Sequence, residues 1–173
     1  MQREIYSLED NINKEDALNN KVNLNINYPW ESADKISEDL KKRDKWQSIF
    51  MPSGAMVAGR TDQKHWLTFG AIDVLPVLYG NYPILMTSDN AQAAVRIGEL
   101  IDDPSKESAR AINWSTIPAG KDINVRMSGL VWPEASQRIA NSAYLTREKV
   151  GKGQVILFSG EPNYRGSALG TNR

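Results

Sequence analysis

The C-terminal stretch VGKGQVILFSGEPNYRGSALGTNR, residues 150–173, bears most directly on the fold. It contains QVILFSG (residues 154–160), a nearly continuous apolar run typical of a central strand that is covered on both faces. The preceding AYLTREKVGKG (residues 143–153) predicts another strand and then a turn, with Gly151 and Gly153 as the turn residues. The stretch therefore predicts a sheet with residues 154–160 in its interior.

Two upstream segments have the features of helices. PWESADKISEDLKKRDKW (residues 29–46) offers Ser32 as an N-cap, acidic residues near its start and basic residues near its end, which suits the helix dipole. PEASQRIANSAYL (residues 133–145) begins with Pro133, and proline is favoured at the first position of a helix. Both segments are predicted to be helical.

Short apolar segments bounded by turn residues predict strands between these helices. Pro76 indicates that its own segment is an edge strand or contains a break, because proline cannot donate to a sheet ladder. The predicted strands are GAMVAGR (54–60), AIDVLPVLYG (71–80), YPILMTS (82–88) and INVRMSGLVW (123–132), whereas AAVRIGEL (93–100) and SKESARAINW (105–114) fit either a strand or a helix. The alternation of helices and strands predicts an α/β fold, with α+β as the alternative.

Length and composition limit the classes of function. The 173 residues suit one domain, and the 21 Lys and Arg residues balance 21 Asp and Glu residues, so no overall charge attracts nucleic acid. The absence of cysteine excludes disulfides, thiolate metal sites and a cysteine nucleophile. No apolar run is long enough for a transmembrane segment. Residues 1–30 are Asn-rich, with Val22, Leu24 and Ile26 alternating with asparagine, and we predict an arm or edge strand there, before a domain over residues 31–173.

His65 is the only histidine, and it does not lie in a recognisable catalytic motif. A zinc carboxypeptidase site needs two imidazoles and a carboxylate, yet Trp66, Leu67 and Thr68 follow His65 and leave the His-x-x-Glu ligand pair incomplete. No G-x-S-x-G nucleophile elbow occurs, and GKG at residues 151–153 does not complete a phosphate-binding loop. The sequence therefore predicts no catalytic, cofactor-binding or metal-binding residue in this chain.

Aromatic side chains suggest an interface instead. The five tryptophans are numerous for this length, and tryptophan between apolar strands commonly belongs to a core or to a domain interface. Tyrosine and arginine are enriched at binding surfaces. The candidate interface residues are His65, Trp66, Trp132, Tyr164 and Arg165.

Three stretches together resemble one protein family: HWLTFG (65–70), SGLVWPEASQRIANSAYLTREKVGKGQVILFSGEPNYRG (128–166) and GTNR (170–173). They look like the C-terminal region of large bacterial M14-family zinc carboxypeptidase-like proteins. In that family the peptidase domain is followed by a domain similar to class I glutamine amidotransferases, which has a flavodoxin-like sheet. The resemblance implies that residues 31–173 form a partial sheet of this kind with flanking helices.

The resemblance also limits the function that we expect. The family's zinc ligands belong to the preceding peptidase domain, and the amidotransferase nucleophile is a cysteine, so no catalytic residue carries over to this chain. Zinc is implied only for the parent's peptidase domain, and a parent of this family would be periplasmic or secreted. The family pattern continues past GTNR into an apolar helix, which implies that the chain is a fragment or remnant.

We therefore expect a non-catalytic accessory region of an M14 zinc carboxypeptidase-like metallopeptidase, which packs against a peptidase domain or another partner protein. One alternative is a stand-alone module that binds a peptide or glycan on its tryptophan and tyrosine side chains. Another is a serine hydrolase that uses His65 with a serine and an acid. The oligomeric state stays open at this point.

Overall fold

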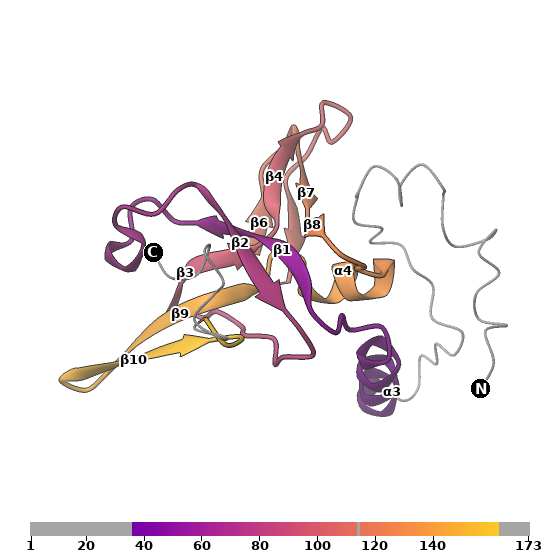
Figure 1. Cartoon of the computed structure of the whole chain (residues 1–173), viewed down its shortest axis with the longest axis horizontal. Helices are drawn as coiled ribbons and strands as arrows, with labels where there is room; N and C mark the ends of the chain where they lie inside the picture. The colour runs from indigo at the N-terminus through magenta and orange to yellow at the C-terminus, as the bar shows by residue number, and fades with distance from the viewer. Residues whose placement is uncertain (1–35, 114, 163–173) are drawn as a thin grey trace, which may run out of the picture.

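The structure is a computed structural model that describes residues 36–113 and 115–162 (Figure 1). Its centre is one curled six-stranded sheet with the order β10-β9-β3-β1-β2, and β8 also pairs with β1. Every strand pair in this sheet is antiparallel. The strands are β1 (Ala55–Thr61), β2 (Val74–Tyr79), β3 (Ala91–Ile97), β8 (Arg126–Ser128), β9 (Ala143–Val150) and β10 (Gly153–Phe158).

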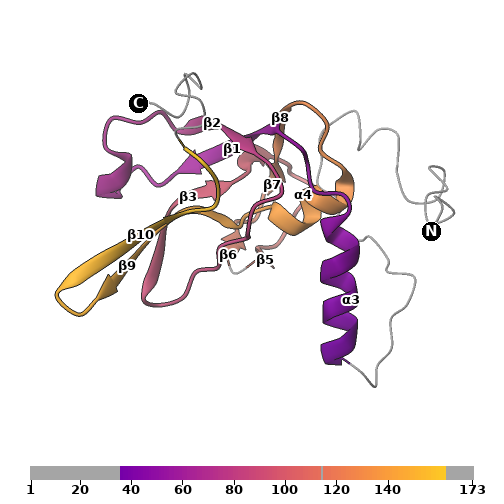
Figure 2. The ribbon, with the colours of Figure 1, turned by 60° about the horizontal axis from the view of Figure 1, so that its bottom comes forward.

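Two small antiparallel ribbons and three helical segments complete the described part of the chain. The ribbons pair β4 (Glu99–Asp102) with β7 (Lys121–Asn124), and β5 (Arg110–Ile112) with β6 (Ser115–Ile117). The helices are α3 (Ile36–Ser48), the 3-10 turn η2 (Trp66–Thr68) and α4 (Pro133–Ile139). Helices α3 and α4 lie together, away from the projecting β9–β10 hairpin (Figures 1 and 2). No helix in the described ranges is long and apolar enough to cross a membrane.

The predicted α/β fold with a partial flavodoxin-like or amidotransferase-like sheet is wrong, because the structure is mostly antiparallel β-sheet. Parallel neighbours need a long crossover connection, usually a helix, whereas antiparallel strands can be joined by tight turns. Helix α4 does lie between two strands in the sequence, but it follows β8 and precedes β9, which are not neighbours in the sheet. The alternation of helices and strands along the chain therefore does not reflect parallel pairing.

The predicted interior position of residues 154–160 is also wrong. Strand β10 ends the sheet, pairs with β9 alone among the described strands, and has all six residues exposed. The predicted turn before it is present, because the register pairs Val150 with Gly153 and Gly151 has a φ of 58°. A left-handed first residue is what the favoured two-residue hairpin turns require. The apolar run predicted the strand correctly, but it did not indicate whether other elements cover that strand.

Other elements match the sequence more closely. Helix α3 overlaps the predicted helix over residues 36–46 and continues to Ser48, and α4 begins at Pro133 as expected. The edge position predicted from Pro76 is confirmed, because β2 ends the sheet opposite β10. The predicted strand at 82–88 forms only an isolated bridge between Leu85 and Ala143, and the one at 123–132 is divided between β7 and β8. The predicted arm and boundary at residue 30 lie outside the described residues.

The ambiguous segment 93–100 is extended and bends sharply between β3 and β4. Gly98 occupies this bend with a φ of 100°, a left-handed conformation that side-chain-bearing residues rarely adopt. A Cβ atom at Gly98 would lie only 2.4 Å from Cγ1 of Ile123, which is fully buried. Glycine thus allows the β4–β7 ribbon to pack directly on the core cluster that contains Val57 and Ile97.

A buried asparagine fixes the start of β9. Asn141 is 0% exposed and has a φ of 60°, and its side chain donates to the Ile112 carbonyl at 3.0 Å and accepts from Arg60 Nη2 at 2.8 Å. Its main chain donates to the Ile97 carbonyl at 2.8 Å and accepts from Arg96 Nη1 at 3.0 Å. Burial lowers the pKa of both guanidinium groups, and the charge of Arg96 lowers that of Arg60 further. These bonds join β1, β3 and β5 to the root of the β9–β10 hairpin.

Candidate interaction surface

The loop between β1 and β2 carries two of the candidate interface residues, His65 and Trp66. It begins with a turn in which the His65 N–H donates to the Asp62 carbonyl at 2.9 Å and the Lys64 N–H donates to Asp62 Oδ1 at 3.0 Å. Aspartate favours such turns because its side chain accepts from the backbone two residues later. The Thr68 N–H then donates to the His65 carbonyl at 3.0 Å and forms the 3-10 turn η2.

Further hydrogen bonds attach this loop to the sheet. The Asp62 N–H donates to the Ala94 carbonyl of β3 at 2.9 Å, and Thr61 Oγ1 donates to the Ile72 carbonyl at 2.9 Å. The Thr68 side chain is buried beneath the loop and donates from Oγ1 to the His65 carbonyl at 2.8 Å. The backbone of the loop is therefore fixed at both ends and in the middle by the chain's own bonds.

Three large apolar side chains project from this fixed loop into solvent. Trp66 is 57% exposed, Phe69 is 95% exposed and Ile72 is 63% exposed. We call these three residues the aromatic loop. The coil of η2 stands out at one end of the sheet, far from helices α3 and α4 in both views (Figures 1 and 2). Aromatic residues that protrude in this way are enriched in the cores of protein interfaces.

His65 supports the loop from its side. Its Nδ1 accepts from the Leu67 N–H at 3.2 Å, and its ring stacks on Trp66 with centroids 6.1 Å apart and an interplanar angle of 24°. A neutral ring that accepts at Nδ1 carries its proton on Nε2, which is buried and has no hydrogen-bond partner among the described residues. In a Ser-His-Asp triad the Nδ1–H instead donates to a carboxylate. The backbone amide of Leu67 occupies that position here.

Trp132, the other candidate interface residue that the structure describes, lies apart from the aromatic loop. Trp132 is half-buried at the N-cap of α4. Its ring meets the ring of Phe50 edge-on, with the two ring centroids 6.5 Å apart. Phe50 in turn contacts Trp46 of α3, which is only 5% exposed, so Trp132 contributes to packing between α3 and α4 and against the core cluster. Tyr164 and Arg165 lie outside the described residues. Of the predicted residues that the structure describes, only His65 and Trp66 lie together.

Sequence reasoning missed Phe69 and Ile72. Both lie in the turn-rich segment HWLTFGAID, and Gly70, with a φ of 78°, ends the turn directly after Phe69. A large aromatic residue next to a turn glycine was a usable signal, because turns lie on the surface.

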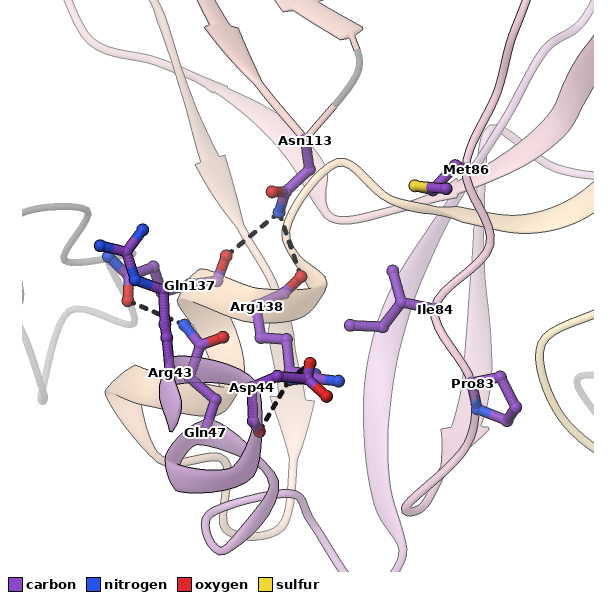
Figure 3. Close-up of a pocket in the computed structure, with 9 residues that line it drawn as sticks. All are labelled: Arg43, Asp44, Gln47, Pro83, Ile84, Met86, Asn113, Gln137 and Arg138. Carbon is purple, nitrogen blue, oxygen red and sulfur yellow. Dashed lines mark hydrogen bonds and ion pairs between the residues drawn. The ribbon is translucent and has the colours of Figure 1, made fainter. Parts of the chain in front are cut away.

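A cavity of about 630 Å³ lies between the two helices and the segment before β3 (Figure 3). One wall is polar and comes from α3, α4 and Asn113, whereas the other is apolar. The nine described lining residues are Arg43, Asp44, Gln47, Pro83, Ile84, Met86, Asn113, Gln137 and Arg138, without a tryptophan or tyrosine among them. The proposed stacking of a peptide or glycan on such rings therefore finds no platform in the described lining.

The polar groups of this cavity are largely used to hold the fold together. Arg138 forms an ion pair with Asp44, and Gln47 Nε2 donates to Gln137 Oε1 at 3.3 Å (Figure 3). The Asn113 side-chain amide contacts the carbonyl oxygens of Gln137 at 3.1 Å and Ala140 at 2.7 Å, so it caps the end of α4. The cavity thus reflects how α3, α4 and the β5–β6 connection are joined.

The described residues contain no group of three or more His, Cys, Asp or Glu side chains arranged to hold a metal ion. No family model matches the sequence, and neither the curated proteins nor the solved structures that were searched contain a significant match. The resemblance of the three stretches to M14-family proteins accordingly stays a hypothesis.

Proposed function

We propose that this chain is a non-catalytic interaction module, and that the aromatic loop is the surface that docks onto its partner. The observation that carries this proposal is the combination of a hydrogen-bonded loop backbone with three exposed side chains, Trp66, Phe69 and Ile72. Large apolar side chains exposed on one loop often mark a surface that another molecule covers.

The loop has the physical properties of a binding hot spot. Complete burial of a large apolar side chain is worth about 1.5–3 kcal/mol, so covering the exposed parts of these three side chains is worth roughly 3–6 kcal/mol. Because internal hydrogen bonds already fix the loop backbone, little conformational entropy is lost on binding. Trp66 is further restrained by its stacking on His65.

The partner that we propose is the peptidase domain of an M14 zinc carboxypeptidase-like protein. The support is the resemblance itself, because HWLTFG, one of the three stretches that carry it, contains two of the three aromatic-loop residues. In this proposal the zinc and the proteolytic chemistry belong to the partner, and the present chain contributes a contact surface. The choice of an M14 peptidase domain as the partner rests on those sequence stretches alone.

Hydrogen–deuterium exchange tests where the partner binds. The full chain is labelled with and without an M14 carboxypeptidase-like domain, and we expect slower exchange of residues 65–73 in the mixture. The cavity-lining segment 83–86 serves as the internal control and should exchange at the same rate in both samples. Protection of 83–86 without protection of 65–73 would refute the docking surface.

An activity assay tests the non-catalytic part of the proposal. The purified chain is incubated with zinc and a reporter peptide that releases a C-terminal amino acid on cleavage. We expect no release above background. Release that a chelator abolishes would show that the chain itself is a metallopeptidase.

A further inference from the structure

Within residues 36–113 and 115–162, strand β10 forms an open sheet edge of an unusual kind. Its four apolar residues are all partly exposed, at 42% for Val155, 37% for Ile156, 48% for Leu157 and 44% for Phe158. Exposure of successive residues means that both faces of the strand meet solvent, because neighbouring side chains point to opposite faces. The strand contains no proline and no charged residue.

The opposite edge of the sheet is protected. Strand β2 carries Pro76, which has no N–H to offer to a further strand, and its residues Val77 and Tyr79 are buried. Proteins commonly protect edge strands with proline, charge or a covering segment. The described residues supply none of these at β10. The β2 edge of the sheet is therefore protected against further pairing, whereas the β10 edge is not.

The register shows which backbone groups of β10 face outward. The closing pair of the two-residue turn is Val150 and Gly153, and bonded and non-bonded pairs then alternate along an antiparallel hairpin. Consistent with this alternation, the Ser159 N–H donates to the Tyr144 carbonyl at 2.7 Å. The odd-numbered residues of β10 therefore bond to β9, and the N–H and C=O groups of Gln154, Ile156 and Phe158 face the open edge.

We propose that this edge pairs with β10 of a second copy of the chain, antiparallel and about a twofold axis at Ile156. This register places Ile156 opposite itself and Gln154 opposite Phe158 of the second copy. All three outward-facing residues of each strand then find a partner. On the other face, Val155 lies opposite Leu157 of the second copy, so apolar side chains meet on both faces of the joined sheets.

Charge favours this arrangement over a parallel one. The hairpin turn carries Lys152, and exposed Glu161 follows the other end of β10. An antiparallel pair brings the Lys152 end of one strand to the Glu161 end of the other. A parallel pair would instead place Lys152 beside Lys152, and like charges in direct opposition are destabilising. The strand between these ends is uncharged, so nothing in it opposes self-pairing.

The first experiment measures the mass of the full chain in solution by sedimentation or light scattering at increasing concentration. We expect the mass to rise from 19.4 kDa toward about twice that value. Ile156→Lys and Ile156→Glu each place like charges on the axis and should weaken the dimer at least about tenfold, whereas an equimolar mixture of the two should restore it. Thr116→Lys, which adds the same charge to an exposed position on β6, should leave the dimer unchanged.

Three results would overturn the proposal. The wild-type chain could stay at 19.4 kDa at hundreds of micromolar, Ile156→Lys could dimerise like wild type, or the mixture of the two charged variants could fail to recover the dimer. Far-UV circular dichroism of each variant shows whether it is folded. None of these measurements involves the aromatic loop, so failure here and failure of the proposed function are separate outcomes.

A spin-label distance tests the strand direction without altering β10. The chain has no cysteine, so Lys152→Cys provides a single labelling site at the hairpin tip. In the antiparallel register the two labelled backbones are roughly 27 Å apart, from eight residue steps of about 3.4 Å each. In a parallel pair they would be about 5 Å apart, and strong line broadening would then contradict the twofold register.

Discussion

Replacing Asn141 by alanine should destabilise the fold strongly, because this side chain joins β1 and β5 to the root of the β9–β10 hairpin. Asn141 is 0% exposed, donates to Ile112 and accepts from Arg60. Alanine removes both bonds and leaves a carbonyl and a guanidinium donor without their partner in a buried place. It also forces a side chain without local hydrogen-bonding capacity into a φ of 60°.

The magnitude follows from these separate losses. A buried group left without its partner costs about 1–3 kcal/mol, and the loss is larger where the group is charged, as at Arg60. The left-handed backbone costs roughly 1–2 kcal/mol more for alanine. Together they predict a loss of about 3–8 kcal/mol, a large part of the 5–15 kcal/mol that typical domains possess.

Urea unfolding followed by tryptophan fluorescence measures this loss. Asn141→Gly is the matched control, because glycine accepts the left-handed φ and therefore loses only the side-chain bonds. We expect the glycine variant to be about 1–2 kcal/mol more stable than the alanine variant. A loss below about 1 kcal/mol for Asn141→Ala would refute the reasoning that these bonds hold the hairpin to the core.

Two further predictions concern the core. Gly98→Ala should lower the free energy of unfolding by more than about 2 kcal/mol, because its Cβ would lie 2.4 Å from Ile123. The control Gly120→Ala, also left-handed but in open space, should lower it by about 1 kcal/mol in the same urea assay. Equal losses would contradict the packing argument. Burial, together with the neighbouring tyrosines, raises the pKa of Tyr144 to about 12 from the ordinary 10.0. The folded chain thus holds this proton more tightly than the unfolded chain does, so stability should fall by roughly 2–3 kcal/mol as pH rises from about 10 to about 12. Urea unfolding at both pH values should show a smaller fall for Tyr144→Phe, and an unchanged fall would be the contrary result.

The sequence predicted local elements better than their arrangement. Pro133 marked the start of α4, and Pro76 correctly indicated an edge strand, because each proline restricts its own backbone position. Strand direction was not predictable in the same way. It depends on which distant segments pair, and α4 lies between β8 and β9 without connecting two neighbouring strands.

The apolar run at residues 154–160 shows where reasoning from composition fails. Hydrophobic side chains in succession are typical of a strand that other elements cover. Whether such a strand is covered, however, depends on distant segments of the chain or on another molecule, which the local sequence does not describe. The same features that misled the assignment of β10 to the sheet interior now support its pairing with a second copy. An exposed Phe158 in an uncharged edge strand is informative only once the sheet order is known.

The candidate site was partly predictable for a similar reason. His65 and Trp66 attracted attention as residue types that are common in functional sites, and the structure places them together in the η2 loop. Trp132 has the same chemistry but packs against Phe50, and nothing in its local sequence distinguishes the two tryptophans. Phe69, at 95% exposure the most exposed of the aromatic-loop residues, was missed because its exposure follows from the course of the turn.

The most direct test of the central claim is a calorimetric titration of an M14 carboxypeptidase-like domain with the full chain. Phe69→Ser should weaken binding roughly 30-fold, from the loss of about 2 kcal/mol of apolar burial. Leu130→Ser removes a side chain that is similarly exposed, at 66%, but outside the aromatic loop, and should leave the affinity unchanged. Binding that both substitutions weaken equally, or no binding by the wild-type chain, would contradict the account.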